Sequence, residues 1–135
     1  AYTSFFKKNN FVIKKNILPP YKINYNKFIK NTSIATSSMM INRKFVKNIK
    51  LSKSPNFEDF YLKCQILKKI EYAHCLNKLL LDYRLRENSL STKSKLRNLF
   101  WIWKINRKFN KINFFQNLVS CMMISINSIK KYGLK

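Results

Sequence analysis

The sequence has one glycine, one histidine and five acidic residues among its 135 residues. A single glycine excludes a glycine-rich phosphate-binding loop, which needs several glycines at fixed spacing. The histidine, His74, lies within an apolar helical pattern, which is typical of an imidazole at the edge of a core. The acids cluster in the same stretch and form no pair with an evident catalytic context. We therefore expect no enzymatic activity and no cofactor.

The sequence also has few cysteines, and their spacing does not fit a metal site. Cys64, Cys75 and Cys121 are odd in number and lack the C-x-x-C spacing of a zinc knuckle. The same scatter argues against a disulfide framework. We expect no metal and three reduced, half-buried thiols.

No long apolar run is present. The longest uncharged stretch, residues 112–129, is interrupted by several asparagine, glutamine and serine residues. A bilayer-spanning helix needs about 18 to 20 predominantly apolar residues. This stretch therefore predicts a helix with one apolar face and no membrane span.

The sequence as a whole is strongly basic. The 28 Lys and Arg residues oppose five acids, for a formal charge of +23. All the acids lie within residues 58–87, so a nearly neutral middle separates two strongly cationic segments. Such a charge favours an anionic partner, either nucleic acid or an anionic membrane surface.

Residues 1–53 are expected to form an extended basic arm. They show no sustained helical or strand period, and Pro19-Pro20 interrupts them. Aromatic residues recur between lysines, which suits stacking on bases beside phosphate contacts. An organellar targeting segment is the rival interpretation, because such segments are basic and free of acids.

Residues 54–135 are predicted to form a small helical domain, which makes the fold all-α. Ser54 can cap a helix, Pro55 fits its first position, and Glu58 and Asp59 suit its first turn. Apolar residues then recur every three or four positions, which predicts a packed helix to about Tyr83. After a polar loop, Ser91 or Thr92 can cap the next helix.

Residues 96–111 form an amphipathic pattern on a helical wheel. One arc of roughly 100° holds Arg97, Lys104, Arg107, Lys108 and Lys111. The opposite side holds the apolar residues Leu96, Leu99, Ile102, Trp103, Ile105 and Phe109, with Phe100 and Trp101 at the borders. Ile102 and Trp103 are expected in the core. The wheel alone does not distinguish a helix on a membrane surface from one that contacts nucleic acid, in which Trp101 could stack on a base.

The same stretch carries a resemblance. FWIWKIN, residues 100–106, resembles the L-W-I-x-R-I-N signature of the bacterial-type large-subunit ribosomal protein L-twenty family. FQNLVSCMMISIN, residues 115–127, is similar to a second motif of that family, and Tyr83-Arg84-Leu85-Arg86 is similar to its Y-R-D-R. The resemblance spans about residues 83–134.

The resemblance implies an all-helical C-terminal domain behind a long basic extension, bound to large-subunit ribosomal RNA and active in ribosome assembly. The implied partners are ribosomal RNA and neighbouring ribosomal proteins, with no small-molecule substrate. The bias towards Lys, Asn, Ile and Phe and the NLVSC segment suggest an organellar ribosome. The expected location is the mitochondrial matrix, with another organelle as the alternative. The candidate RNA-binding residues are Arg84, Arg86, Arg97, Trp101, Lys104, Arg107, Lys108, Lys111, Lys130 and Lys131.

Two alternatives remain open at this point. One is a basic, lineage-specific subunit of a mitochondrial membrane complex, whose cations would lie on anionic lipid. The other is a different mitochondrial ribosomal protein.

Overall fold

The computed structural model describes residues 2–8, 11–47, 49, 57–84 and 94–132. The four α-helices in these ranges are α1 Tyr25–Asn31, α2 Glu58–Leu67, α3 Lys95–Lys108 and α4 Phe114–Tyr132. Two short 3-10 helices are η1 Thr36–Ser38 and η2 Arg43–Phe45. The strands in the described residues are β1 Tyr2–Lys8, β2 Phe11–Ile17, β3 Lys22–Ile23, β4 Ala73–His74 and β5 Asp82–Arg84.

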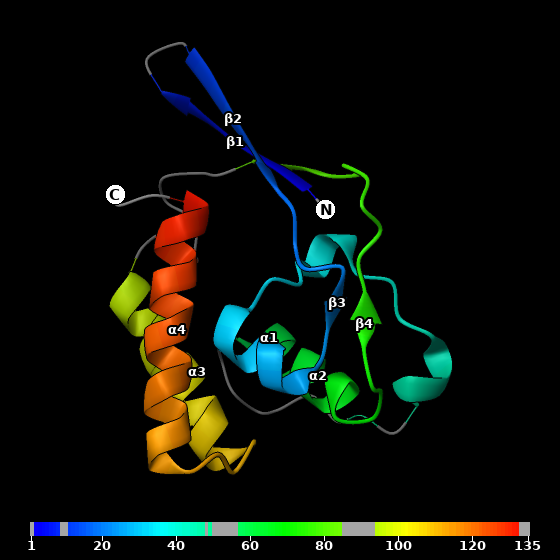
Figure 1. The fold of residues 1–135 in the computed structure, drawn as a ribbon, viewed down its shortest axis with the longest axis vertical. Coiled ribbons are helices and arrows are strands. Elements are labelled where there is room, and N and C mark those ends of the chain that lie inside the picture. The colour runs from blue at the N-terminus through cyan, green and yellow to red at the C-terminus, as the bar shows by residue number, and fades with distance from the viewer. Residues whose placement is uncertain (1, 9–10, 48, 50–56, 85–93, 133–135) are drawn as a thin grey trace.

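The fold is mostly helical, as predicted, and α3 and α4 make its C-terminal region helical. The strands were not predicted. The β1–β2 hairpin is antiparallel, and β5 pairs with β1 in parallel, which gives the strand order β2-β1-β5. The short strands β3 and β4 form a separate antiparallel pair. Figure 1 shows the hairpin at one end of the molecule and the helices at the other.

The first 53 residues contain regular structure, contrary to the expectation of an aperiodic arm. Helix α1 begins where the Asn24 side chain accepts a hydrogen bond from the Lys27 backbone N–H at 3.0 Å. It ends at Thr32, which takes a left-handed conformation with φ of 47°. Phe28 and Ile29 on this helix are buried, and burial of apolar side chains stabilises a helix too short to persist alone. The boundary predicted at residue 53 stays a prediction.

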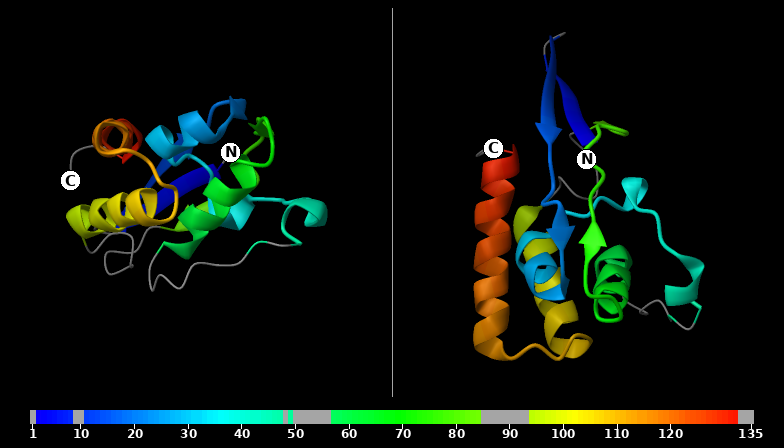
Figure 2. Two further views of the ribbon diagram at one scale, coloured as in Figure 1. Left: turned by 90° about the horizontal axis from the view of Figure 1, so that it is seen from below. Right: turned by 45° about the vertical axis from the view of Figure 1, so that its right-hand side comes forward.

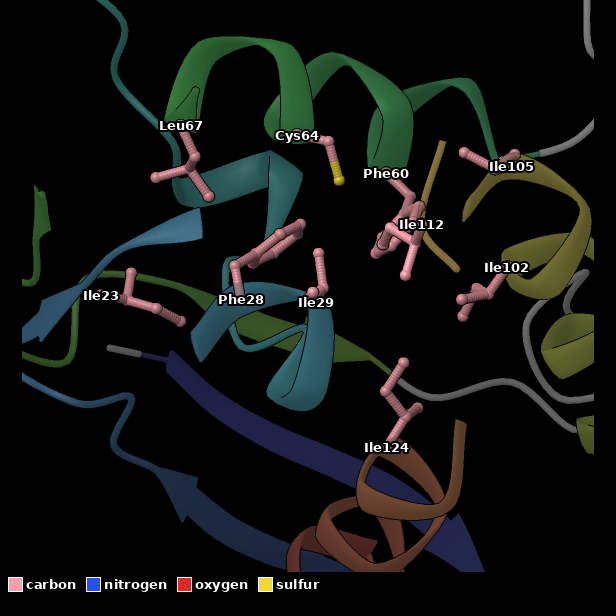
Figure 3. Packing of buried hydrophobic residues seen from close by; sticks show 10 residues of the cluster. All are labelled: Ile23, Phe28, Ile29, Phe60, Cys64, Leu67, Ile102, Ile105, Ile112 and Ile124. Carbon is pink, nitrogen blue, oxygen red and sulfur yellow. The ribbon is translucent and has the colours of Figure 1, made fainter. Parts of the chain in front are cut away.

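The hydrophobic core joins α1 to α2, α3 and α4. The Phe28 and Phe60 rings stack with centroids 5.5 Å apart. Figure 3 shows these two residues among the apolar side chains that α2 and α3 direct towards α1. The buried cluster consists of Ile23, Phe28, Ile29, Phe60, Cys64, Leu67, Ile102, Ile105, Ile112 and Ile124.

Helix α2 is much shorter than predicted. Glu58 and Asp59 occupy its first turn as expected, but Phe57 precedes it without a side-chain cap, and Ser54 and Pro55 lie outside the described residues. The helix ends at Leu67 instead of continuing to Tyr83. The chain then turns so that β4 pairs with β3, and the Cys75 N–H donates to the Tyr21 carbonyl at 2.8 Å. The local spacing of apolar residues cannot predict that β4 pairs with β3, because β3 lies some 50 residues earlier in the chain.

Helix α3 matches the predicted helix closely, although Ser94 is its cap. The Ser94 side chain accepts from the Arg97 N–H at 3.2 Å, and the predicted caps Ser91 and Thr92 lie outside the described residues. Ile102 and Ile105 are buried as the wheel predicts, and Trp103 is half-buried. Leu96 departs from the prediction, because its side chain is 80% exposed.

Buried amides hold α3 and α4 together. The Asn106 side-chain amide donates to Asn117 Oδ1 at 2.9 Å and to Ser120 Oγ at 3.4 Å. The Asn110 amide donates to Asn106 Oδ1 at 3.0 Å, and the Asn117 amide donates to the Trp103 carbonyl at 3.2 Å. Asn106, Asn117 and Ser120 have no exposed surface, so these bonds replace hydration that the groups lose on folding.

Side chains of α4 also bind the end of α1. Its last carbonyls lack partners within the helix. The Ser120 hydroxyl donates to the Ile29 carbonyl, and the Asn127 amide donates to the Lys30 carbonyl at 3.1 Å. The Lys131 ammonium donates to the Asn31 carbonyl at 2.9 Å. The polar side of α4 therefore faces the protein and caps α1.

We predict that Asn106→Ala lowers the free energy of unfolding by about 3 kcal/mol, because it leaves the buried Asn110 amide nitrogen and Asn117 Oδ1 without these partners. Gln116→Ala, on the exposed side of α4, should change it by less than about 0.5 kcal/mol. Urea unfolding followed by circular dichroism measures both. Equal unfolding midpoints for the two variants would show that the network contributes little.

We also predict that the three thiols react with iodoacetamide at pH 8 in the order Cys75, Cys121, Cys64. The thiolate is the reacting form, and burial raises the pKa of Cys64 to about 12. Burial also raises the pKa of Cys121, which is half-buried. Peptide mass spectrometry of timed samples gives the order, with urea-unfolded protein as the control in which all three react. Early labelling of Cys64 in folded protein would contradict the structure.

Candidate functional site

A cavity of about 460 Å³ opens between α2, the β3–β4 pair and the segment that runs from Ser33 to Phe45. Most of its lining is apolar, including Met39, Ile66 and Leu80. Ligand sites commonly have this size and combine apolar walls with a few placed polar groups. The polar and charged side chains in the lining are Ser33, Ser37, Ser38, Asn42, Lys63 and His74.

Ser33 lines this cavity and carries a buried hydroxyl. The residue is only 4% exposed, and its Oγ has no hydrogen-bond partner in the described part of the chain. Buried hydroxyls in native proteins are nearly always hydrogen-bonded to protein or water. The hydroxyl of this lining residue is therefore an exception that the described protein does not explain.

Lys63 brings a cation to the same cavity. Its side chain is 6% exposed, and its Nζ lies 3.0 Å from Asp59 Oδ2 and 2.7 Å from Thr36 Oγ1. The Thr36 hydroxyl in turn donates to Asp59 Oδ2 at 2.7 Å. A buried ammonium is stable only when it is paired and hydrogen-bonded, and Asp59 and Thr36 satisfy this requirement. The three side chains therefore form one connected group, of which Lys63 lines the cavity.

The carboxylate of this group is ionised at neutral pH. Burial alone would raise the pKa of the Asp59 carboxyl. The Lys63 charge and the hydrogen bonds from Thr36, Lys63 and the Phe60 backbone outweigh burial and hold the pKa below its ordinary value. The Asp59 side chain is 48% exposed, so a molecule from solvent can reach it.

His74 lies at the cavity on β4, not on a helix at the core edge as predicted. It is exposed, and its ring centroid is 6.0 Å from that of Tyr21. Within the described ranges, no three His, Cys, Asp or Glu side chains gather where they could hold a metal ion. In the same ranges, no helix combines the length and apolar character needed to cross a membrane.

The residues predicted to bind RNA lie elsewhere. Lys104 Nζ is 4.8 Å from the Phe100 ring centroid and 5.2 Å from that of Trp101, which is half-buried. Arg107 donates to the Ile112 carbonyl at 3.0 Å, and Lys108 Nζ lies 5.5 Å from the Phe109 ring centroid.

The other predicted residues occupy several different surroundings. Arg97, Lys111 and Lys130 are exposed, whereas burial lowers the pKa of Lys131 to about 8. Arg84 ends β5, and Arg86 lies outside the described residues. None of the ten is among the described residues that line the cavity.

The sequence offered a weak signal for the site and did not reveal most of it. Asp59 and Lys63 are four residues apart, the spacing of an ion pair along a helix. Ser33 and Thr36 lie in the stretch assigned to the arm, and only the fold brings them to α2.

A comparison with known proteins finds a similarity to the putative teichuronic acid biosynthesis glycosyltransferase TuaG of Bacillus subtilis (strain 168). The two sequences are 27% identical over 119 residues, which is 88% of this chain and 47% of that protein. The chain thus spans about half the length of this relative. No family model matches the chain. No solved structure matches it either.

The comparison contradicts the ribosomal interpretation. The similarity extends over 119 residues, whereas the ribosomal resemblance rested on short motifs after residue 83. The resemblance to the L-twenty family is therefore wrong, and so is the structural role in ribosome assembly. The comparison does not support the two alternatives either. The relative's name points to an enzyme with a sugar substrate, so the predictions of no enzyme, no small-molecule substrate and ribosomal RNA as partner are also wrong. The mitochondrial location stays a prediction.

We predict that the Asp59 interactions make stability depend on acid pH. The pKa of Asp59 is lowered in the folded state, so its contribution is present above the ordinary carboxyl value of 3.8 and is lost as pH falls below it. Asp59→Asn should therefore be less stable than wild type at pH 7, with the difference shrinking towards pH 3. Urea midpoints at several pH values measure it, with Glu71→Gln, at an exposed position, as the matched control. A difference that does not change with pH would refute the assignment.

Proposed function

We propose that this chain is part of a glycosyltransferase and that the cavity beside Lys63 binds the sugar-containing substrate. The supporting observation is the similarity to a putative glycosyltransferase along 88% of the chain. A glycosyltransferase moves a sugar from an activated donor to an acceptor hydroxyl. The similarity extends across both the cavity-lining segments and the C-terminal helices, because 119 of 135 residues align.

The chemistry of the cavity suits such a substrate. Apolar walls pack against the carbon faces of a sugar ring, and isolated polar groups select the positions of its hydroxyls. Ser33 Oγ, buried and without a partner among the described residues, fits a sugar hydroxyl. Lys63 supplies a positive charge next to the space that the substrate would fill, where an anionic leaving group would be stabilised.

Asp59 is the candidate base. As the acceptor oxygen attacks the anomeric carbon, the bond from that carbon to the leaving group breaks and the acceptor hydroxyl loses its proton. An ionised carboxylate within reach of the hydroxyl can take that proton. Asp59 is ionised, partly exposed and bonded to Thr36 and to Lys63, the member of this group that lines the cavity. Glu58 precedes it in the same helical turn but is not part of this bonded group.

Calorimetric titration of the chain with a panel of uridine and guanosine diphosphate sugars tests the binding site. We expect at least one donor to bind, and we expect Lys63→Met to weaken it about tenfold or more by removing a buried charge-assisted contact. Ser33→Ala should weaken binding several-fold with little effect on folding. Lys78→Met is the matched control at an exposed position and should bind as wild type.

Melting curves identify variants that have simply unfolded, and Ser33→Ala keeps the test valid if Lys63→Met is one of them. Failure of every donor at millimolar concentration would overturn the proposed site. Binding that is the same in Ser33→Ala, Lys63→Met and Lys78→Met would overturn it as well.

Turnover tests the base separately. Release of nucleoside diphosphate from a bound donor should fall by about 100-fold in Asp59→Asn, which removes the proton acceptor. Donor binding should stay within a few-fold of wild type. Binding without any turnover in the wild-type chain would contradict a catalytic role for Asp59 in this chain while leaving the binding site in place.

A further inference from the structure

The outward side of α4 is apolar. The side chains of Phe115 and Met122 are 77% and 57% exposed, and apolar neighbours on the same side are also exposed. At about 100° per residue the set falls within one arc of roughly 100° that contains no polar position. Its members are Phe115, Leu118, Val119, Met122, Ile126 and Ile129. We call this set the α4 outer face.

This arrangement is the reverse of an ordinary surface helix, which turns its apolar side inward. The inward side of α4 holds Asn117, Ser120 and Ile124, all buried, and its polar groups bind α3 and the end of α1. The described protein thus fixes the rotation of α4 and directs the α4 outer face to solvent. Figure 2 shows α4 at the edge of the molecule, with α1 and α3 on its inner sides.

Aromatic rings extend the apolar surface at the start of α4. Phe114 is 53% exposed, and its ring centroid is 5.7 Å from that of Phe115. The Trp103 ring meets Phe114 edge-on at 5.4 Å, which joins α3 to this surface. Trp, Phe and Leu are typical of the apolar face of helices that lie in a membrane interface.

The positive charge around the α4 outer face indicates which kind of partner binds it. Residues 94–132 contain no aspartate or glutamate. Lys130 borders the α4 outer face, Lys111 precedes the helix, and Lys104 and Lys108 on α3 are exposed. A second copy of the chain would bring a cationic surface against another and be repelled. An anionic lipid surface instead offers both an apolar layer and negative headgroups.

We propose that the α4 outer face docks on an anionic membrane surface, with its apolar side chains at the level of the headgroups and acyl chains. The helix would lie along the membrane, in agreement with the finding that no described helix is able to span one. The interaction goes beyond the proposed sugar transfer and does not depend on it, because the cavity and the α4 outer face share no residue.

Co-sedimentation of the full chain with vesicles tests the proposal. Vesicles of phosphatidylcholine with a third phosphatidylglycerol should bind the chain, and pure phosphatidylcholine vesicles should bind it at least tenfold more weakly. Raising the salt from 50 to 500 mM should weaken binding to the anionic vesicles, because screening reduces the attraction.

The variants separate the α4 outer face from overall charge. Met122→Glu should lower binding about tenfold or more, because it places a charge in the apolar layer. Gln116→Glu makes the same change of charge on the same helix, outside the apolar arc, and should lower binding only a few-fold. Leu118→Glu serves as a second test if the melting curve shows that Met122→Glu is unfolded.

Three results would overturn the proposal. The first is a wild-type chain that does not sediment with anionic vesicles. The second is an equal loss of binding in Gln116→Glu and Met122→Glu, which would leave charge alone as the cause. The third is sedimentation velocity that shows a dimer abolished by Met122→Glu in a chain that does not bind vesicles, which would make a second copy the occupant.

Discussion

The arrangement of the helices depends on the hydrogen bonds of the buried Asn106 amide. The Asn106 amide donates hydrogen bonds to Asn117 and Ser120 of α4. The Ser120 hydroxyl in turn donates to the Ile29 carbonyl at the end of α1. Directional bonds of this kind fix the rotation of a helix, whereas apolar contacts alone tolerate several rotations. The orientation of α4 against α3 and the Ser120 bond to the end of α1 both belong to this network.

The network also explains why the sequence predicts α4 with one apolar face but does not show which face is buried. Apolar residues recur at helical spacing from Phe115 to Ile129, and the usual rule places such a face inward. The inward face is instead set by Ser120, Asn127 and Lys131, whose partners on α1 are about 90 to 100 residues away in the chain. The local spacing of apolar residues does not reveal those partners. For α3, where Ile102 and Ile105 are buried against the core, the same rule gave the correct inner face.

The region before residue 57 shows a second limit of sequence patterns. Helix α1 is too short to persist alone, and its stability comes from Phe28 stacking on Phe60 and from carbonyls capped by α4. The candidate site depends on the same long-range packing, since Thr36 reaches Asp59 and Lys63 only when the early segment lies against α2. In sequence, Asp59 and Lys63 read as an ordinary ion pair on a helix surface. The structure shows that Lys63 is buried at a cavity, and the binding role proposed for Lys63 rests on this position.

The ribosomal motif has a physical explanation in the same helices. In FWIWKIN, Ile102 and Ile105 fill the core, Asn106 forms the buried network and Lys104 packs over two aromatic rings. A short pattern of that kind reflects how two helices pack together. It can therefore arise in unrelated proteins whose helices pack in the same way. The positive charge that suggested an RNA partner is then explained by a different anionic partner. An apolar face on α4, turned outward by the Asn106 network and surrounded by a region without acids, gives the cations of α3 and α4 a lipid surface as their counterpart.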